Sequence, residues 1–296
     1  MRVTLLMPSE QILQSINRQE QAILNDQTQI STGIQLTEPS SDPAAYTQDM
    51  AVTQSLQQTK TWQHVATSAL SMAQSADQTL TQINQAANTA YTDALKILSP
   101  VGSAGFSALS ETLTQLNESI GQLANTKVAS VYVVGGAAGT APWSGGTSTT
   151  VASAPAMQVQ LGSHLAAAQN VDGGPAISAV MQAISKLAAL TQAAQPGQST
   201  WTNSVNSALK QLQSAQANLG GLQAEFGTNM QRLEAAQNIL ANASTSLTAS
   251  QASLQDASIP AVVSQLSTQE TVYRAVLQVS GRVLLPSLAN YLSQIG

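Results

Sequence analysis

The chain lacks several residue types on which enzymes and nucleic-acid-binding proteins depend. It contains no cysteine, which excludes disulfides, thiolate catalysis and cysteine metal sites. Charged residues make up only 8% of the chain and the net charge is −5, so no basic patch is available to attract nucleic acid or an anionic membrane. Aromatic residues make up 3%, and so few bulky side chains predict thin apolar seams between helices rather than a thick core.

Recognisable catalytic and cofactor-binding patterns are also missing. The two histidines, His64 and His164, stand outside any H-E-x-x-H motif, so we predict no metal site. The run from Gly135 to Gly139 is rich in glycine, but no Lys-Ser/Thr pair or acidic partner follows at the spacing of a nucleotide-binding loop. We therefore expect no enzymatic activity and no cofactor.

The first residues do not form a general export signal. The apolar run Val3–Met7 is interrupted by Thr4 and stopped by Pro8. Such a run is too short for the core of a signal peptide or for a membrane span. If the protein leaves the cell, we expect it to do so without the general secretory signal.

A seven-residue period organises the second half of the sequence. From Val205 an apolar residue recurs at every seventh position as far as Leu254, and mostly small residues stand three positions after each one. An unbroken period over about 50 residues predicts a left-handed coiled coil roughly 75 Å long, at about 1.5 Å per residue. A helix this long cannot bury its seam against itself, so another part of the chain has to supply a partner.

The first half of the sequence supplies that partner. Asp42 and Pro43 form an N-cap and first-turn signal, and a helix is predicted from there to about Leu98. Its apolar stripe runs from Trp62 to Ile97 in alternating steps of four and three, with mostly small side chains that permit close approach. We predict that the two long helices pair in antiparallel orientation, accompanied by shorter helices over residues 106–123 and 177–187.

Residues 126–175 have a different composition. Val131–Val134 is a β-prone run, and Met157–Leu161 alternates apolar and polar residues as a half-buried strand does. We predict a small inserted β element with Tyr132 and Trp143 in its core. The predicted fold class is therefore mainly α, with long antiparallel coiled-coil helices from both halves of the chain and a small β element in the middle.

Both ends carry thin amphipathic stripes that one chain buries poorly, and we predict that they make contacts between subunits. Pro286 lies within the second stripe and is expected to kink or end its helix. The N-terminal stripe consists of Ile12, Ile16, Ile23 and Ile30, and the C-terminal stripe of Leu266, Tyr273, Leu277, Leu284, Leu288 and Tyr291.

Two motifs near the N-terminus, S-T-G at residues 31–33 and P-S-S-D-P at 39–43, resemble those of the flagellin superfamily. Within it they are most similar to the branch of hook-associated protein 3, at the hook–filament junction, whose members have S-T-G followed by P-S-D-D-P-A-A. Flagellins usually have A-x-D-D-A-A-G in this loop, so the two prolines favour the junction branch, while Ser41 departs from its first aspartate. The matching residues are Ser31, Thr32 and Gly33, then Pro39, Ser40, Asp42 and Pro43.

The middle and the C-terminus continue the resemblance in the same order along the chain. Leu123–Thr126 and Tyr132–Gly136 resemble the L-A-N and Y-I-F-x-G elements of the family. The tail Ser287–Leu292 resembles the S-L-x-x-Y/F-L ending of junction proteins rather than the A-N-Q ending of flagellin. The short insertion suggests a reduced outer domain.

The resemblance implies a secreted, extracellular structural protein of the bacterial flagellum that joins hook to filament. It implies export in an unfolded state through the flagellar type III apparatus with the help of an export chaperone. It also implies assembly as a ring with other copies of itself, between a neighbouring hook-associated protein and flagellin. The terminal segments would become ordered as coiled coils on assembly.

This interpretation divides the chain into five parts: assembly segments at residues 1–40 and 257–296, the two halves of a helical rod domain at 41–125 and 176–256, and the β-rich insertion at 126–175. Two alternatives remain. One is a filament flagellin, which the loop and tail motifs disfavour. The other is a surface adhesin or a cytosolic coiled-coil binding module, and a cytosolic protein would usually carry more charge than 8%.

Overall fold

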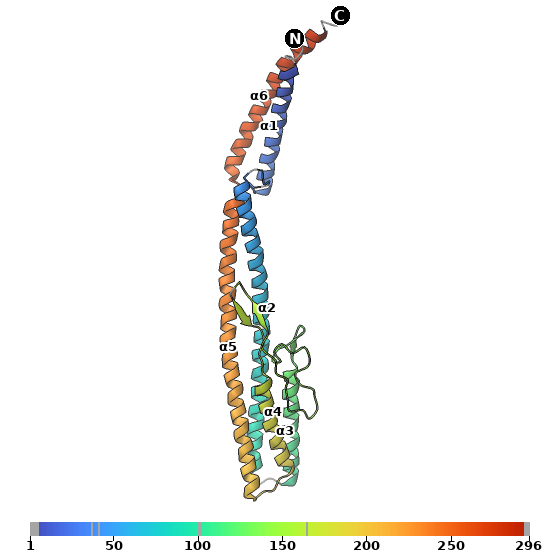
Figure 1. The fold of residues 1–296 in the computed structure, drawn as a ribbon, viewed down its shortest axis with the longest axis vertical. Helices are drawn as coiled ribbons and strands as arrows, with labels where there is room; N and C mark the ends of the chain where they lie inside the picture. Colours follow the sequence, from blue (N-terminus) through green and yellow to red (C-terminus); the bar gives the residue numbers. More distant parts are fainter. Residues whose placement is uncertain (1–5, 37, 41, 100–101, 164, 293–296) are drawn as a thin grey trace. The chain divides into compact units, whose positions relative to one another are not determined.

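The chain is mainly helical, as predicted. The computed structural model describes residues 6–36, 38–40, 42–99, 102–163 and 165–292; of residues 6–9, 103 and 282–292 it describes the backbone alone. The helices, shown in Figure 1, are α1 (Leu6–Thr32), α2 (Pro43–Leu95), the 3₁₀ turn η1 (Lys96–Leu98), α3 (Ser103–Ala124), α4 (Gly174–Gln192), α5 (Ser199–Gln255) and α6 (Ile259–Leu292). Contacts within the chain define two compact units. We call Met1–Gln57 with Thr245–Gly296 the terminal unit, and Gln58–Ser244 the central unit.

The central unit is built on the predicted pairing of the two long helices. Figure 1 shows α2 and α5 side by side, with α3 and α4 alongside them. The predicted stripe of α2 is buried from Ala66 to Ile97, with Trp62 partly buried, and the seam of α5 is buried at every seventh position from Val205 to Leu240. The predicted burial of these two stripes is therefore confirmed.

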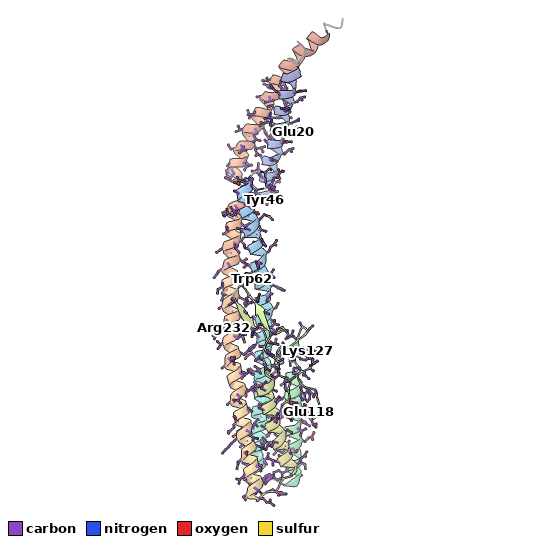
Figure 2. All side chains as sticks on the ribbon, in the orientation of Figure 1. Glu20, Tyr46, Trp62, Glu118, Lys127 and Arg232 are labelled. Atoms are coloured by element: carbon purple, nitrogen blue, oxygen red, sulfur yellow. The ribbon has the colours of Figure 1, made fainter. Side chains whose placement is uncertain are left out.

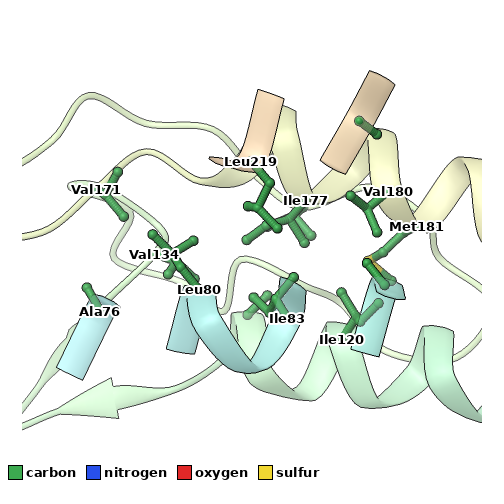
Figure 3. Packing of buried hydrophobic residues seen from close by; sticks show 14 of the residues in the cluster. Ala76, Leu80, Ile83, Ile120, Val134, Val171, Ile177, Val180, Met181 and Leu219 are labelled. Atoms are coloured by element: carbon green, nitrogen blue, oxygen red, sulfur yellow. The ribbon is translucent and has the colours of Figure 1, made fainter. Parts of the chain in front are cut away.

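Four helices share one apolar core. Figure 3 shows Leu80 and Ile83 of α2, Ile120 of α3, Ile177 and Met181 of α4, and Leu219 of α5 together in it. All six are 0% exposed. Burying such a side chain stabilises the fold by roughly 1.5–3 kcal/mol. This shared core gives the central unit its own source of stability.

Uncharged hydrogen bonds fix the register between α2 and α5. In the central unit side-chain amides of α5 donate to α2, and as the residue number of the donor rises along α5, that of the acceptor falls by the same amount along α2. Such pairs occupy the flanking positions where coiled coils commonly place salt bridges. They are Gln213 to Tyr91 Oη (2.7 Å), Gln216 to Asn88 Oδ1 (2.9 Å), Gln223 to Thr81 Oγ1 (3.2 Å) and Gln237 to Thr67 Oγ1 (3.1 Å).

The insertion contains two short antiparallel pairs, β1 (Lys127–Val128) with β2 (Val131–Tyr132) and β3 (Gln158–Gln160) with β4 (Ala166–Ala168). The predicted Val131–Val134 strand is shorter than expected, because Val133 and Val134 turn into the core, where both are fully buried. Tyr132 and Trp143 are each 7% exposed, which confirms their predicted place in the core.

Asn170 organises the insertion from inside. Its side chain is fully buried, and its Oδ1 accepts a hydrogen bond from the backbone N–H of Met157 (2.7 Å). Its Nδ2 donates to the carbonyls of Tyr132 (3.1 Å) and Gly136 (2.6 Å). One side chain therefore satisfies three backbone groups, which a loop-rich segment cannot satisfy through strand pairing.

Candidate assembly surface

The terminal unit pairs α1 with α6 in antiparallel orientation (Figure 1). Along each helix the positions that face the partner recur in steps of four and three, and all are buried or half-buried. We call these positions the terminal seam. They are Ile12, Ile16, Gln19, Ile23, Asp26 and Ile30 of α1, with Val262, Leu266, Gln269, Tyr273, Val276 and Ser280 of α6.

The terminal seam is thinner and more polar than the core of the central unit. Of its twelve positions only Asp26, Val262 and Ser280 are buried, and two of those three are polar. Gln19 donates its Nε2 to the backbone carbonyl of Gln269 (3.1 Å), which places these two residues at the same level of the pair. An apolar seam with few buried side chains contributes little free energy to offset the conformational entropy that two long helices lose when they become ordered.

Asp26 is the most unusual member of the seam. It is only 4% exposed, and its Oδ2 has no hydrogen-bond partner among the described residues. Burial raises the pKa of this carboxyl above its ordinary value of 3.8, because the charged form loses its hydration. A buried, unpaired carboxylate opposes the association of α1 with α6 at neutral pH.

A short β-like contact ties α1 to the junction of α5 and α6. Ile34 pairs with Asp256, the N–H of Gln35 donates to the carbonyl of Gln255 (2.6 Å), and the N–H of Ala257 donates to the carbonyl of Gly33 (2.9 Å). Gly33 has a φ of 73°, a left-handed conformation that favours glycine. The glycine of the S-T-G motif is therefore where the chain leaves α1 and reaches this contact.

The other loop-motif residues have local roles. Asp42 Oδ1 accepts hydrogen bonds from the N–H groups of Ala44 and Ala45, both 3.0 Å, and Pro43 is the first residue of α2, so the predicted N-cap is confirmed. Ser31 and Thr32 donate their hydroxyls to the carbonyl of Thr28. Ser40 bonds Glu38 Oε2 (3.1 Å), and Pro39 is exposed.

Large apolar side chains remain exposed beside the terminal seam. Leu13 and Leu24 of α1 are 57% and 55% exposed, and Val279 of α6 is 57% exposed. The remaining ones among the described residues of this unit are Ile259, Val263, Val272 and Leu277 of α6, and Met50 of α2. Apolar surface concentrated on one helical pair is typical of a surface that binds another protein.

The structure places most of the predicted stripe on the terminal seam. Ile12, Ile16, Ile23, Ile30, Leu266 and Tyr273 all belong to it, whereas Leu277 stands one position beyond it. Leu284, Leu288 and Tyr291 are on α6, but their side chains lie outside the described residues. Pro286 was expected to kink or end the helix; α6 continues past it to Leu292, so the helix does not end there.

Some seam residues were not predicted from the sequence. Asp26 was missed because a charged residue is rarely assigned to a buried position, although it continues the alternating steps of α1. Val262 and Val276 were missed because this segment contains several valines, and the sequence alone does not show which of them face α1. Extending the four–three spacing outward from Leu266 and Tyr273 would have identified both.

Neither a metal-binding site nor a membrane-spanning helix finds support in the described part of the chain. No group of three or more histidine, aspartate or glutamate side chains gathers among the described residues. His64 is exposed on α2, and His164 lies outside those residues. Over the same part of the chain, no helix is apolar for long enough to span a bilayer.

Comparisons with known proteins match this chain by structure and not by sequence. No family model and no curated protein matches it. The crystal structure of FlgL from Bacillus cereus is similar, with a TM-score of 0.58 at 17% identity over 68% of this chain and 99% of that one. A Vibrio parahaemolyticus structure, described as a flagellar hook-associated protein, gives 0.61 at 13% identity over 73% and 100%. The chain therefore has the fold of these proteins, as the sequence motifs predicted.

Proposed function

We propose that this chain is a structural protein of the bacterial flagellum that joins the hook to the filament. The observation that carries the proposal is the terminal unit, in which a thin, half-buried seam is bordered by exposed apolar side chains. The shared fold with flagellar hook-associated proteins and the ordered sequence motifs support the same conclusion. The function is then assembly, with no chemical step.

The mechanism we propose is folding coupled to association. Eight large apolar side chains of the terminal unit are between 38% and 57% exposed. Burying their exposed portions would contribute roughly 6–12 kcal/mol per copy, at about 1.5–3 kcal/mol for a whole side chain. Much of this would be offset by the entropy lost when α1 and α6 become fixed in the assembly.

The proposed partners follow from the position of such a protein in the flagellum. Copies of the chain would form a ring through their terminal units, between a neighbouring hook-associated protein and flagellin. Export through the flagellar type III apparatus, assisted by a chaperone, would deliver the chain to the outside of the cell. A weakly held terminal unit suits this route, because it is the part that has to remain open until assembly.

Hydrogen exchange on the free, full-length protein tests the coupled folding. We expect amides of residues 10–32 and 259–281 to exchange at least about a hundredfold faster than those of α3 and α4, since local stability follows buried apolar contact. Protection in the terminal unit equal to that of the central unit, in the free protein, would contradict the mechanism.

A filament flagellin remains the alternative within the same class of assemblies. Purified flagellin elongates filaments by itself in precipitating salt, whereas a junction protein is expected to stay monomeric or form short rings. Electron microscopy of the purified chain under these conditions separates the two. Long filaments of this chain alone would favour the flagellin alternative over the junction role.

A further inference from the structure

The terminal seam divides the surface of the α1–α6 pair into two sides. Both helices are right-handed and they run in opposite directions, so the residue after each seam position falls on the same side in both helices. The residue before each seam position falls on the other side. The exposed residues of α1 and α6 can therefore be assigned to one side or the other from their distance to the seam.

On the side formed by the residues after each seam position, carboxylates lie between apolar side chains. We call this side the acidic face. It includes Leu13, Glu20 and Leu24 of α1 with Val263, Glu270, Arg274 and Leu277 of α6. Since Gln19 and Gln269 lie at one level, Glu20 and Glu270 stand side by side, with apolar pairs above and below. The four apolar residues are between 43% and 57% exposed.

The acidic face is incompletely neutralised. Glu270 forms an ion pair with Arg274, one turn later in α6, at 3.5 Å. Glu20, labelled in Figure 2, is exposed and forms no ion pair with any described side chain. A cationic group from outside the pair would therefore complete this face.

The side formed by the residues before each seam position has the opposite charge. We call this side the basic face. It consists of Arg18 and Ala22 of α1 with Val272, Ala275 and Val279 of α6. Arg18 is exposed and, among the described side chains, has no ion-pair partner. Val272 and Val279 beside it are 44% and 57% exposed.

We propose that the acidic face of one copy binds the basic face of the next copy, with Arg18 of one chain against Glu20 of its neighbour. Unlike faces in contact give a head-to-tail arrangement, which generates a ring or a helix rather than a closed pair. Arg18 and Glu20 are two residues apart in the same helix, so neighbouring copies meet at nearly the same height. The proposal rests on the assembly function above and names the contact through which it operates.

Charge disfavours the symmetric alternative. Two acidic faces in contact would bring Glu20 against Glu20, and two basic faces would bring Arg18 against Arg18. Like charges that lose water on contact oppose binding. Only the unlike combination pairs Arg18 of one copy with Glu20 of the next.

Cross-linking in flagella isolated from the producing bacterium tests the contact directly. The chain has no cysteine of its own, so introduced thiols are unique. A short bismaleimide should join full-length chains carrying both Arg18→Cys and Glu20→Cys into a ladder of multimers, because each copy offers one thiol to each neighbour. Within one chain the two thiols point to opposite sides of α1 and cannot be joined readily.

Single variants give the controls for this experiment. Glu20→Cys alone should give no multimers, and Gln14→Cys, exposed on α1 midway between two seam positions, should give none either. Cross-linked dimers of Glu20→Cys alone would overturn the head-to-tail arrangement in favour of a symmetric one. Absence of cross-links in the double variant, with the chain present in the flagella, would overturn the face assignment and leave the proposed function intact. Absence of even the wild-type chain from flagella would overturn the proposed function itself.

Charge reversal gives a second, independent measurement. Glu20→Arg or Arg18→Glu alone should lower the amount of chain in flagella about tenfold, and the two changes in one chain should restore it. Cells that produce both single variants should also recover, since each supplies the charge the other lacks. Gln14→Arg, which adds a charge on α1 midway between two seam positions, should behave as wild type. Single variants that assemble normally, or a double variant that does not recover, would contradict the pairing of Arg18 with Glu20.

Discussion

Replacing Asp26 by asparagine should strengthen the α1–α6 pair. Asp26 is 4% exposed in the terminal seam with an unpartnered Oδ2, so its charge loses hydration without a compensating bond. Asparagine has nearly the same shape and no charge. Leaving a buried polar group unsatisfied costs about 1–3 kcal/mol, and more for a charged one. Asparagine still leaves a buried amide unsatisfied, so the gain is the extra cost of the charge. The pair in the variant should therefore open less often at neutral pH, by about tenfold for each 1.4 kcal/mol of that extra cost.

The effect has a defined pH dependence. Burial raises the pKa of Asp26 above 3.8 in the folded protein, so the destabilisation is fully present above that raised pKa. It decreases as the pH falls through the raised pKa and is gone below the unfolded value of about 3.8. The wild-type pair should therefore become more stable on acidification, and the variant should lose this dependence on Asp26.

Amide exchange of α1 and α6 between pH 4 and pH 8, corrected for intrinsic rates, measures both effects. At pH 7 the Asp26→Asn variant should be better protected than wild type, and the difference should close toward pH 4. Glu10→Gln removes an exposed charge from the same helix and should change protection by less than about 0.5 kcal/mol. Lower protection in Asp26→Asn at pH 7, or equal protection in wild type at all pH values, would refute the reasoning.

Three substitutions in the central unit test its construction. Asn170→Ala leaves three backbone groups without their partner and should lower the free energy of unfolding in urea by roughly 2–5 kcal/mol, while Asn203→Ala, exposed on α5, should change it little. Gly221→Ala should raise the melting temperature and increase the free energy of unfolding by up to about 1 kcal/mol. Gly221 is exposed within α5, and nothing lies within 4 Å of an added Cβ. Gly136→Ala should lower the melting temperature, since a Cβ there would lie 1.9 Å from the carbonyl oxygen of Ala154 and φ is 59°.

The long helices could be predicted because their information is local and repeated. The seven-residue series from Val205 and the alternating stripe from Trp62 to Ile97 each define one face of a helix, and burial follows those faces. Asp42 and Pro43 mark the start of α2 through short-range chemistry that the structure reproduces. The division of the chain into five parts remains a prediction.

The hydrogen bonds between α2 and α5 could not be predicted from the sequence. Glutamine and threonine at flanking positions look like any solvated helix surface, and their pairing depends on a register between segments far apart in the chain. In the terminal unit Gln251 donates to the Thr53 hydroxyl in the same way (2.9 Å), and Gln255 donates to the Asp49 carboxylate (2.9 Å). A chain with 8% charged residues thus specifies its register largely through amides and hydroxyls.

The insertion and the two faces of the terminal unit were also outside the reach of sequence patterns. Strand β4 consists of Ala166–Ala168, and alanine has little preference for strands. Asn170 is one of many asparagines, and only its burial reveals its role. The separation of Arg18 from Glu20 onto opposite faces becomes visible only when the seam between α1 and α6 is known.

A strain of the producing bacterium that lacks this chain gives the most direct test of the proposed junction role. The account predicts hooks without attached filaments by electron microscopy, flagellin shed into the medium, and loss of swimming that the wild-type chain restores. Filaments that remain attached to hooks in the deletion strain would contradict it.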